Sequence, residues 1–477
     1  MPSECVMSSD QSLPAATPTA ELDRIKGYPF LGVVPRVRKD PLRFYSELSR
    51  DRGDIVQLRF GPEWLYFLNR RDHIKHVFQD NRDNYIKSKH YSRMKFLLGD
   101  GMFTTNGETW AAQRRSAQPA FNGDHLKKMF GIMRAATEDM LVRWDQNVTE
   151  NREIGLSSEA MRLALDVALR TLFGIILNDQ ARVIYDALNV ILPELERRVW
   201  AVTPLASYLP LRKVKACKEA IAAIERVVHE IIFERLNAEH QADDLMSMLI
   251  AAEKARWDDQ SLKRLRDQAV IFLIAGHETT ATTLTWAWYC LSKFPLIDRR
   301  LSAEVQSVLG ARPVELGDLD TLAYTRAVFQ ETMRLFPPGW LLTREALADD
   351  TIGGRLIPKG STVIICAYSM HRMPEYWDNP EGFDPSRFSP ERMKEIDSSV
   401  YFPFGGGNRT CIGNRFAMME AQIILAETVR KFRLELVTGQ DIVPSAMITI
   451  RPKHEIRMRL RRRENVPNEQ SGLQQVA

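Results

Sequence analysis

A glycine-rich segment near the C-terminal end of the chain places a cysteine where its sulfur could bind a metal. The segment reads Phe404-Gly405-Gly406-Gly407-Asn408-Arg409-Thr410-Cys411-Ile412-Gly413. Glycine lets a backbone approach a flat cofactor closely and adopt positive φ angles. We predict that Cys411 begins a helix, so that free N–H groups and the helix dipole lower the pKa of its thiol. An ionised thiolate is the form of cysteine that binds metals.

The distribution of the cysteines argues against other kinds of site. The chain has five, which are scattered, odd in number and never spaced as C-x-x-C: Cys5, Cys217, Cys290, Cys366 and Cys411. This pattern is unlike a disulfide framework, a zinc site or an iron–sulfur cluster, and it favours a reducing compartment.

A second unusual run, Ala275-Gly276-His277-Glu278-Thr279-Thr280, interrupts a long stretch of helical periodicity. Glycine inside a helix costs about 1 kcal/mol relative to alanine, and such exceptions to local rules tend to mark functional positions. A carboxylic acid beside a hydroxyl group can relay protons. His277-Glu278 also begins a zinc-protease pattern, but Ala281 stands where that pattern needs a second histidine. An ordinary buried helix with a threonine bonded to its own backbone is the plainer alternative.

Together, these runs resemble the cytochrome P450 family. The family pattern F-x-x-G-x-R-x-C-x-G is matched at every fixed position, and residues 275–280 are similar to its A/G-G-x-D/E-T-T. The matching positions of the first pattern are Phe404, Gly407, Arg409, Cys411 and Gly413.

The resemblance implies a cofactor and roles for several side chains. The cofactor is haem b (heme b, iron protoporphyrin IX), with Cys411 as the thiolate ligand that pushes electron density toward O–O cleavage. Phe404 and Arg409 are implied to bind this cofactor. Thr279 is implied to hold the oxygen or water network, and Glu278 to supply protons.

The resemblance also assigns partners to the two haem propionates, which need cations. Trp110 and Arg114 lie one helical turn apart and resemble the family's W-x-x-x-R. Arg344 matches another family propionate ligand, and Arg409 precedes the thiolate by two residues. For His371 we find no such role and interpret it as a structural histidine.

Glu331-Thr332-Met333-Arg334 matches the family's E-x-x-R, whose two charged side chains share one helix face. The spacing alone is common, and we interpret three further examples as surface pairs. The family context implies that Arg387 joins Glu331 and Arg334 in a structural cluster that locks the segment before Cys411. The three surface examples are Glu47…Arg50, Glu159…Arg162 and Glu194…Arg197.

The sequence patterns around these residues predict a mostly α fold with small β-sheets (α+β), in a single large domain. Residues 1–25 read as a disordered leader, 26–462 as the cytochrome P450 domain and 463–477 as a polar C-terminal tail. Gly61-Pro62 between the apolar runs 54–60 and 64–68 signals a hairpin.

Helical periodicity dominates from about residue 105 to residue 335. We predict helices over about 260–293, from Asp318 to Phe336, where Pro337 and Pro338 stop it, and from Cys411 to about Lys431. Strand-like runs at 432–437 and 446–451 close the chain. The haem is expected between the long central helix and the helix after the Cys411 loop.

The composition limits the partners. A net charge of +4 on 477 residues gives no reason to expect nucleic acid. No run of about 18 apolar residues is present, so we expect no integral membrane anchor. The first 25 residues lack a signal pattern, so we expect a cytoplasmic protein of the soluble bacterial type.

No G-x-G-x-x-G fingerprint for a dinucleotide is found, so electrons must come from a separate ferredoxin or flavodoxin with its reductase. A basic docking face for that partner is expected at Arg114, Arg115, Lys127, Lys128 and Arg415.

The expected function is a monooxygenase that uses O₂ to insert one oxygen atom into a hydrophobic small molecule, such as a fatty acid or a terpenoid. Contact with that substrate is expected from residues 85–103, from Ala275 with Thr279, and from Gly339–Leu342, where Trp340, Leu341 and Leu342 indicate an apolar pocket. Three alternatives stay open: a peroxide-driven or isomerising haem-thiolate enzyme, a non-catalytic haem binder, and a helical scaffold without a cofactor.

Overall fold

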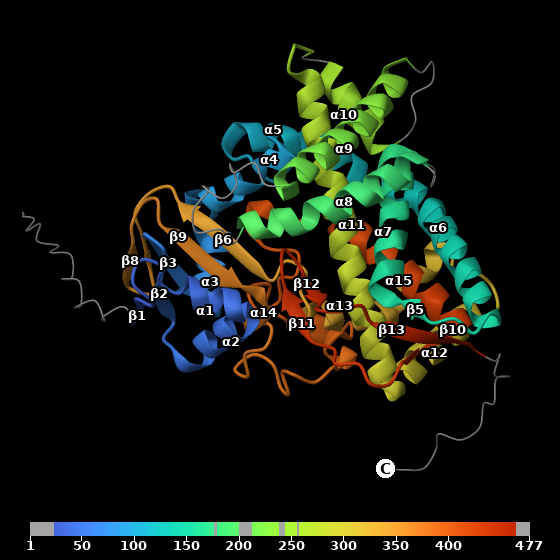
Figure 1. Ribbon diagram of the computed structural model, residues 1–477. Helices are drawn as coiled ribbons and strands as arrows, with labels where there is room; N and C mark the ends of the chain where they lie inside the picture. Colours follow the sequence, from blue (N-terminus) through green and yellow to red (C-terminus); the bar gives the residue numbers. More distant parts are fainter. Residues whose placement is uncertain (1–22, 176–178, 200–211, 238–243, 255–256, 464–477) are drawn as a thin grey trace, which may run out of the picture.

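The longest helix, α11 (Ser261–Lys293), passes through the interior of the molecule. The computed structural model describes residues 23–175, 179–199, 212–237, 244–254 and 257–463. In Figure 1, α11 crosses the middle of the fold with α7 (Leu156–Phe173) packed along it. The helix agrees with the one predicted at about 260–293, and it ends before Pro295, which has no backbone N–H to donate.

The sequence of α11 explains its central position. Most of its side chains from Leu265 to Leu291 are buried, and a helix that is apolar on most sides is stable only inside a protein. Three of its threonines, Thr279, Thr283 and Thr285, donate their hydroxyls to carbonyls of the same helix, as Thr285 does to Ala281 at 2.8 Å. The Trp286 ring stacks on Phe336, with ring centroids 4.1 Å apart.

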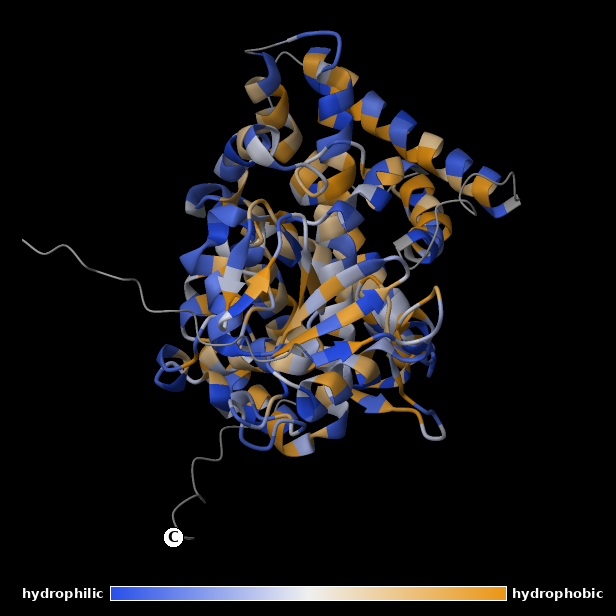
Figure 2. Cartoon of the chain, turned by 90° about the vertical axis from the view of Figure 1, so that its left-hand side faces the viewer, coloured by the Kyte–Doolittle hydropathy of each residue, from blue (hydrophilic) through white to orange (hydrophobic). Residues whose placement is uncertain are grey.

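Further helices pack around α11 on the helix-rich side of the molecule. Figure 2 shows bands of hydrophilic and hydrophobic residues along these helices, as expected of helices with one buried face. They are α5 (Gly107–Ala117), α6 (Gly123–Thr149), α8 (Asp179–Val199), α9 (Arg212–Asn237), α10 (Leu245–Lys254), α12 (Pro295–Leu309), α13 (Ala323–Leu335) and α15 (Asn414–Lys431). Shorter helices are α1 (Val34–Lys39), α2 (Pro41–Asp51), α3 (Arg71–Lys75), α4 (Lys95–Leu98) and α14 (Ala367–Met370).

A six-stranded sheet forms the other side of the molecule, with the order β1-β2-β3-β9-β6-β4 (Figure 1). The predicted hairpin is confirmed, since β2 and β3 pair antiparallel across Gly61, which has φ 63°. The strands are β1 (Asp23–Ile25), β2 (Ile55–Phe60), β3 (Glu63–Leu68), β4 (Tyr85–Lys87), β6 (Leu341–Ala346) and β9 (Thr362–Cys366).

Three smaller sheets complete the mostly α architecture with small β-sheets that the sequence predicted. The first contains β5 (Ile154–Gly155), β10 (Phe432–Leu436) and β13 (Arg457–Arg462). The other two are the pairs β7 (Asp350–Ile352) with β8 (Arg355–Ile357), and β11 (Pro444–Ala446) with β12 (Ile450–Pro452).

The folded domain extends beyond the predicted boundaries at both ends. Asp23–Ile25 were assigned to the leader, but they form β1 and pair with β2 in parallel. Arg463, assigned to the tail, forms an ion pair with Asp298 at 2.5 Å. The rest of the predicted leader and tail lies outside the described residues.

Three further predicted boundaries were wrong. The helix predicted from Asp318 begins at Ala323, because Asp318 caps a separate short turn while Glu304 accepts the first N–H groups of α13. The final helix begins at Asn414 rather than Cys411. The strand predicted at 446–451 is a hairpin, in which β11 and β12 flank a turn closed by the Met447 N–H and the Thr449 carbonyl.

The predicted charged cluster on α13 is present and fully buried. Arg334 uses all five of its N–H donors: two go to Glu331, at 2.7 and 2.8 Å, and three go to carbonyl oxygens. Arg387 lies 3.5 Å from a Glu331 oxygen. The cluster therefore fastens α13 to the segment that leads to Cys411. The three carbonyls belong to His371, Pro380 and Gly382.

The same segment confirms the structural interpretation of His371. Its side chain is fully buried, and its Nε2 accepts the Phe402 N–H at 3.0 Å. The three E-x-x-R examples interpreted as surface pairs differ from the prediction. Glu194 does pair with Arg197 but is buried, Glu47 pairs with Arg43, and Glu159 accepts a hydrogen bond from Trp144.

A buried carboxyl group, Glu420, lies between α15 and α11. It is fully buried and accepts a hydrogen bond from the Thr280 hydroxyl at 3.3 Å. Burial raises the pKa of Glu420 to about 8, and the Thr280 hydroxyl opposes this shift only in part.

We expect Glu331→Ala and Arg334→Ala to prevent haem incorporation. Either change leaves a buried charge without its partner, at a cost of about 3–5 kcal/mol, and releases the segment before Cys411. Haem content per protein is measured from the absorbance of the purified variants. Glu47→Ala, which breaks only an exposed pair with Arg43, serves as the control. Full haem occupancy in either buried variant would contradict this structural role.

Glu420→Gln should stabilise the fold increasingly as the pH rises from about 4.5 to about 8. In this range the unfolded chain releases the Glu420 proton while the folded chain keeps it, so wild-type stability falls as pH rises. The glutamine cannot titrate, so its advantage should grow by about 3–5 kcal/mol. Unfolding of both proteins in urea at pH 5 and pH 8.5 measures the difference, and an equal difference at both pH values would refute it.

Candidate active site

The loop that carries Cys411 is held against the segment that follows α3. Gly405 and Gly407 have positive φ angles of 71° and 67°. A Cβ atom on Gly407 would lie 2.3 Å from the Phe78 carbonyl oxygen, and one on Gly406 would lie 2.3 Å from the Phe78 ring. The glycines are therefore needed because Phe78 lies directly against the loop.

Within the loop, the Cys411 N–H donates to the Phe404 carbonyl at 2.9 Å. Cys411 is accessible to solvent although protein atoms surround its sulfur, and we infer from this that the thiol borders an enclosed space, which we call the slot. The other cysteines of the described chain, at 217, 290 and 366, are buried.

The predicted lowering of the Cys411 pKa was wrong. Burial raises the pKa of the thiol, whereas the Gly413 N–H and the cations Arg114 and Lys87 act in the opposite direction. Since α15 begins at Asn414, Gly413 is the residue at the helix start whose N–H acts on the sulfur, and burial outweighs its effect.

The structure brings the predicted cationic side chains together beside this slot. Arg409 donates to the Asn106 side chain at 2.7 Å, and its guanidinium lies 3.8 Å from the centre of the Trp110 ring. Arg114 donates to the Thr410 carbonyl, the residue before Cys411, at 3.0 Å. Trp110 and Arg114 both come from α5, as their spacing predicted.

Arg344 comes from the neighbouring strand β6 and is almost completely buried. Burial lowers its pKa, and burial together with Arg344 and Arg114 lowers the pKa of Arg409 to about 10. These cations therefore repel one another at close range.

Lys87 is a fourth cation that the sequence analysis missed. It pairs with Arg344 across the antiparallel strands β4 and β6. Its ammonium group donates to the Phe103 carbonyl at 3.0 Å, and burial together with Arg344 and Arg409 lowers its pKa well below the ordinary value. The only sequence signal was its place in a short strand, which becomes meaningful once β4 is paired with β6.

This donor set fits a haem. The groups that act electrostatically on the four cations are the cations themselves, Cys411 and Tyr91. Mutually repelling, partly buried cations are stabilised by an anionic partner, and two propionates supply two negative charges. A thiol at the slot wall and close-packed glycines match the needs of an iron ligand beside a flat macrocycle.

On α11, the two predicted catalytic residues point in different directions. Thr279 is half-buried, and its hydroxyl donates to the Ala275 carbonyl at 2.7 Å. Glu278 is buried and faces β11–β12, where it accepts the Thr449 hydroxyl at 2.8 Å and lies 3.3 Å from Arg451. Adjacent residues on a helix do not face each other, so the acid and the hydroxyl group are not in direct contact.

Thr449 and Arg451 were also missed by the sequence analysis. They lie on alternate positions around the buried Ile450, so both side chains extend to the same side of the hairpin. That alternation was visible in the sequence, but it gave no sign of which helix the hairpin would contact.

Part of the expected substrate region is accessible, and the substrate contact itself stays a prediction. Ala275 is exposed and Thr279 half-buried although most of α11 is buried, so this face opens onto an interior space. Partly buried apolar side chains occur within residues 85–103, and Leu341 and Leu342 are also partly buried. Trp340 was assigned wrongly: it is buried in the core against Tyr45, and its N–H donates to the Met447 carbonyl.

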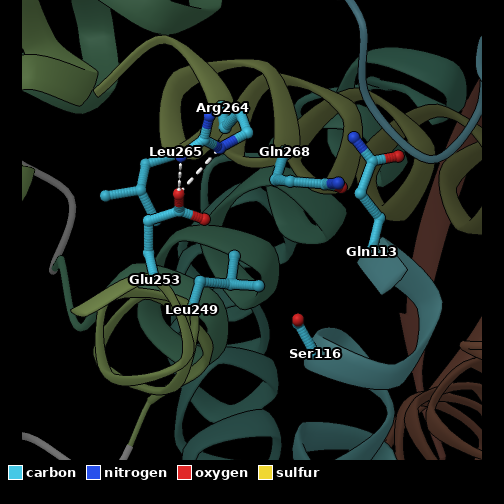
Figure 3. Close-up of a pocket in the computed structure, with 7 residues that line it drawn as sticks. All are labelled: Gln113, Ser116, Leu249, Glu253, Arg264, Leu265 and Gln268. Atoms are coloured by element: carbon cyan, nitrogen blue, oxygen red, sulfur yellow. Dashed lines mark hydrogen bonds and ion pairs between the residues drawn. The ribbon is translucent and has the colours of Figure 1, made fainter. Parts of the chain in front are cut away.

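A separate cavity lies between α5, α10 and α11 (Figure 3). Its volume is about 20 Å³, which is enough for one water molecule and too small for an organic substrate. The Arg264 guanidinium is bonded to Glu253 at one side, and Gln268 and Gln113 extend toward each other at the other.

Four of the five predicted docking cations are exposed, namely Arg115, Lys127, Lys128 and Arg415. Arg114 is half-buried and belongs to the slot. Within the part of the chain that the structure describes, no helix has the length and apolar character needed to cross a membrane.

Comparison with known proteins agrees with this geometry. The cytochrome P450 family model matches residues 24–457. Cyclooctatin synthase of Streptomyces melanosporofaciens is 34% identical over 431 residues, covering 89% of this chain and 92% of that protein. Cyclooctat-9-en-7-ol 5-monooxygenase of the same organism is 31% identical, with 87% and 89% covered. Pentalenene oxygenase of Streptomyces avermitilis is 29% identical, with 91% and 95% covered.

The matched segment includes both the thiol loop and the central helix, and it extends over almost all of the described residues. The chain therefore belongs to the cytochrome P450 family, and it is a monooxygenase whose cofactor is haem b.

Proposed function

We propose that this protein inserts one atom of O₂ into a hydrophobic, terpenoid-like substrate, with Cys411 as the iron ligand. The observation that carries the proposal is the slot itself, where one accessible thiol lies beside four cations that lack a carboxylate partner among the groups acting on them. Three relatives named for cyclooctatin, cyclooctat-9-en-7-ol and pentalenene support a terpenoid-like substrate. A fatty acid is the second substrate class.

When bound, haem b supplies the binding and activation of O₂. The protein then has to hold the cofactor, and we assign this to Arg409, Arg114, Arg344 and Lys87 through the propionates, with Trp110 stacked on Arg409. Phe404 accepts the Cys411 N–H through its carbonyl and so fixes the loop.

Insertion of one oxygen atom consumes two electrons and two protons, and the second oxygen atom leaves as water. We assign Thr279 to hold water or oxygen at the open face of α11, where Ala275 and Thr279 are accessible. Glu278 is the nearest carboxyl group in sequence, and we assign it to proton supply. Since it faces Thr449, its proton reaches the Thr279 side through water or a change of side-chain rotamer.

The electrons are proposed to come from a separate ferredoxin or flavodoxin with its reductase. The exposed cations Arg115, Lys127, Lys128 and Arg415 suit an acidic protein of this kind, because complementary charge speeds encounter.

We expect dithionite-reduced, purified protein to give the red-shifted Soret band of a thiolate-ligated haem on addition of carbon monoxide. Cys411→Ser should lose this band. With a ferredoxin, its reductase and NADPH, the wild-type protein should oxidise pentalenene in preference to dodecanoic acid. Product formed with hydrogen peroxide alone would favour the peroxide-driven alternative, and a low-spin spectrum that no ligand perturbs would favour a non-catalytic haem binder.

Thr279→Ala should keep haem and the carbon monoxide band but lose coupling, because the hydroxyl group acts after the cofactor is in place. The measured quantity is product formed per NADPH consumed, which we expect to fall about tenfold while hydrogen peroxide release rises, at the low end of what positioned proton-transfer groups contribute. Thr279→Ser, which keeps the hydroxyl group, is the matched control. Normal coupling in the alanine variant would refute the assignment.

A further inference from the structure

A cavity of about 220 Å³, lined by both polar and apolar side chains, lies beside α11, and its wall includes His277 and Arg451, which are neighbours of Glu278. Its inner wall contains buried side chains of α11, including Thr282 and Thr285. Its outer rim is formed by exposed residues at the start of α7, on α8 and after β12, so the cavity joins the surface to the interior. The exposed residues are Ser158, Asn189, Lys453, His454 and Glu455.

A chain of hydroxyl groups leads from this cavity to the buried acid. The Thr449 hydroxyl donates to Glu278 Oε1 at 2.8 Å. Thr449 Oγ1 also lies 3.4 Å from Thr282 Oγ1. A hydroxyl group has only one hydrogen, so Thr449 accepts from Thr282 while it donates to Glu278. The chain therefore has one direction, from the cavity toward the carboxyl group.

Arg451 fixes the far end of this chain. Its Nη2 lies 3.3 Å from the same oxygen of Glu278, and the residue also lines the cavity. The guanidinium holds the Glu278 side chain toward the hairpin, where Thr449 can reach it. Glu278 thus faces the cavity side of α11 rather than the Thr279 side.

The cavity walls require water. The His277 ring nitrogens and Arg451 Nε and Nη2 make no hydrogen bond of good geometry among the described residues, and the Met161 backbone acts on only one side of the His277 ring. Buried polar atoms are nearly always hydrogen-bonded, and a cavity of this size with such polar groups in its wall has room for several water molecules. Burial lowers the pKa of His277 to about 4, so its ring is neutral near pH 7 and can both donate to water and accept from it.

We propose that this cavity is the solvent proton inlet of the enzyme, with Thr282, Thr449 and Glu278 as its relay and Arg451 as a positioning residue. This inference rests on the proposed function, in which protons are consumed on the Thr279 side of α11. It extends that proposal by naming the route by which Glu278 regains its proton.

Each proton moves from the cavity to Glu278 in three transfers. Cavity water gives a proton to the Thr282 oxygen and regains one from bulk solvent through the water at the rim. The Thr282 oxygen passes its own hydrogen to the Thr449 oxygen. Thr449 passes its hydrogen to Glu278 Oε1, whose earlier proton has left toward the Thr279 side. Each hydroxyl group ends with one hydrogen, and both reorient before the next transfer. Two such cycles supply the two protons of one turnover.

The first test is a crystal structure of the haem-loaded protein at a resolution that shows ordered water. We expect water within hydrogen-bond distance of Thr282 Oγ1 and of the His277 ring, connected to the rim at His454. A dry cavity, or water that is cut off from Thr282, would overturn the inlet. The positions of the water molecules can be determined without measuring enzyme activity.

The second test compares Thr449→Val and Thr282→Val with Thr171→Val, using pentalenene, ferredoxin, its reductase and NADPH. All three replace a buried hydroxyl group by a methyl group of similar size, but the Thr171 hydroxyl donates to the Val167 carbonyl of its own helix and does not line the cavity. We expect about a tenfold loss of product per NADPH in the first two variants, with KM unchanged, and no loss in the third. Thr449→Ser should restore coupling.

Arg451 and the rim are tested in the same assay. Arg451→Met should reduce coupling and Arg451→Lys should retain most of it, with the carbon monoxide band intact in both. Asn189→Trp, at the rim, should slow turnover and enlarge the solvent deuterium isotope effect. Val190→Trp, at an exposed neighbouring position that does not line the cavity, should do neither.

Different results would refute the proposed function, the substrate class and the proton relay. Wild-type protein without the thiolate band would refute the proposed function, and wild-type protein that gives the band but no product from pentalenene would refute the substrate class. Normal coupling in Thr449→Val and Thr282→Val, in a wild-type background that is active, would refute only the relay.

Discussion

The five donors of one buried guanidinium are the constraint on which the haem slot depends. Arg334 cannot lose its charge, and in the interior it is tolerated only because each of its N–H groups has an acceptor. Those acceptors come from α13 and from the irregular segment that leads to the thiol loop. Because that segment has little regular secondary structure, backbone ladders cannot hold it. The segment is held instead by the energetic cost of leaving a buried charge without partners, and this fixes the loop of Cys411, whose glycines lie against Phe78.

The cations beside the thiol differ from Arg334, because no anionic side chain among the described residues pairs with them. Burial lowers the pKa of each of Arg409, Arg344, Lys87 and Arg114, and repulsion by neighbouring arginines lowers the pKa of Arg409 and Lys87 further. This arrangement destabilises the protein alone, and in the proposed assignment the two propionates of haem b relieve it. Binding energy is therefore stored in the fold as electrostatic strain between α5, β4 and β6, which makes retention of the cofactor and folding of these elements parts of one equilibrium.

The parts of the structure that could be predicted from the sequence are those whose information is local. The thiol loop, the length of α11, the hairpin at Gly61 and the E-x-x-R pair are written in consecutive residues. Lys87, Thr449 and Arg451 could not be found in this way, because their roles arise from the pairing of β4 with β6 and from the contact between a C-terminal hairpin and a helix far away in the chain. Trp340 was misplaced for the same reason, since its neighbour Tyr45 is distant in sequence.

The hairpin β11–β12 also limits how this protein can evolve. One short turn accepts hydrogen bonds from Trp340 at the Met447 carbonyl and from Trp286 at the Ile450 carbonyl, while Thr449 between them reaches Glu278. A one-residue insertion or deletion reverses the side on which every later side chain of a strand lies. Such a change here would disturb two tryptophan anchors and the acid in a single step. The turn should therefore accept substitutions at Ile448 far more readily than changes of length, and the effects of mutations at its other positions should depend strongly on one another.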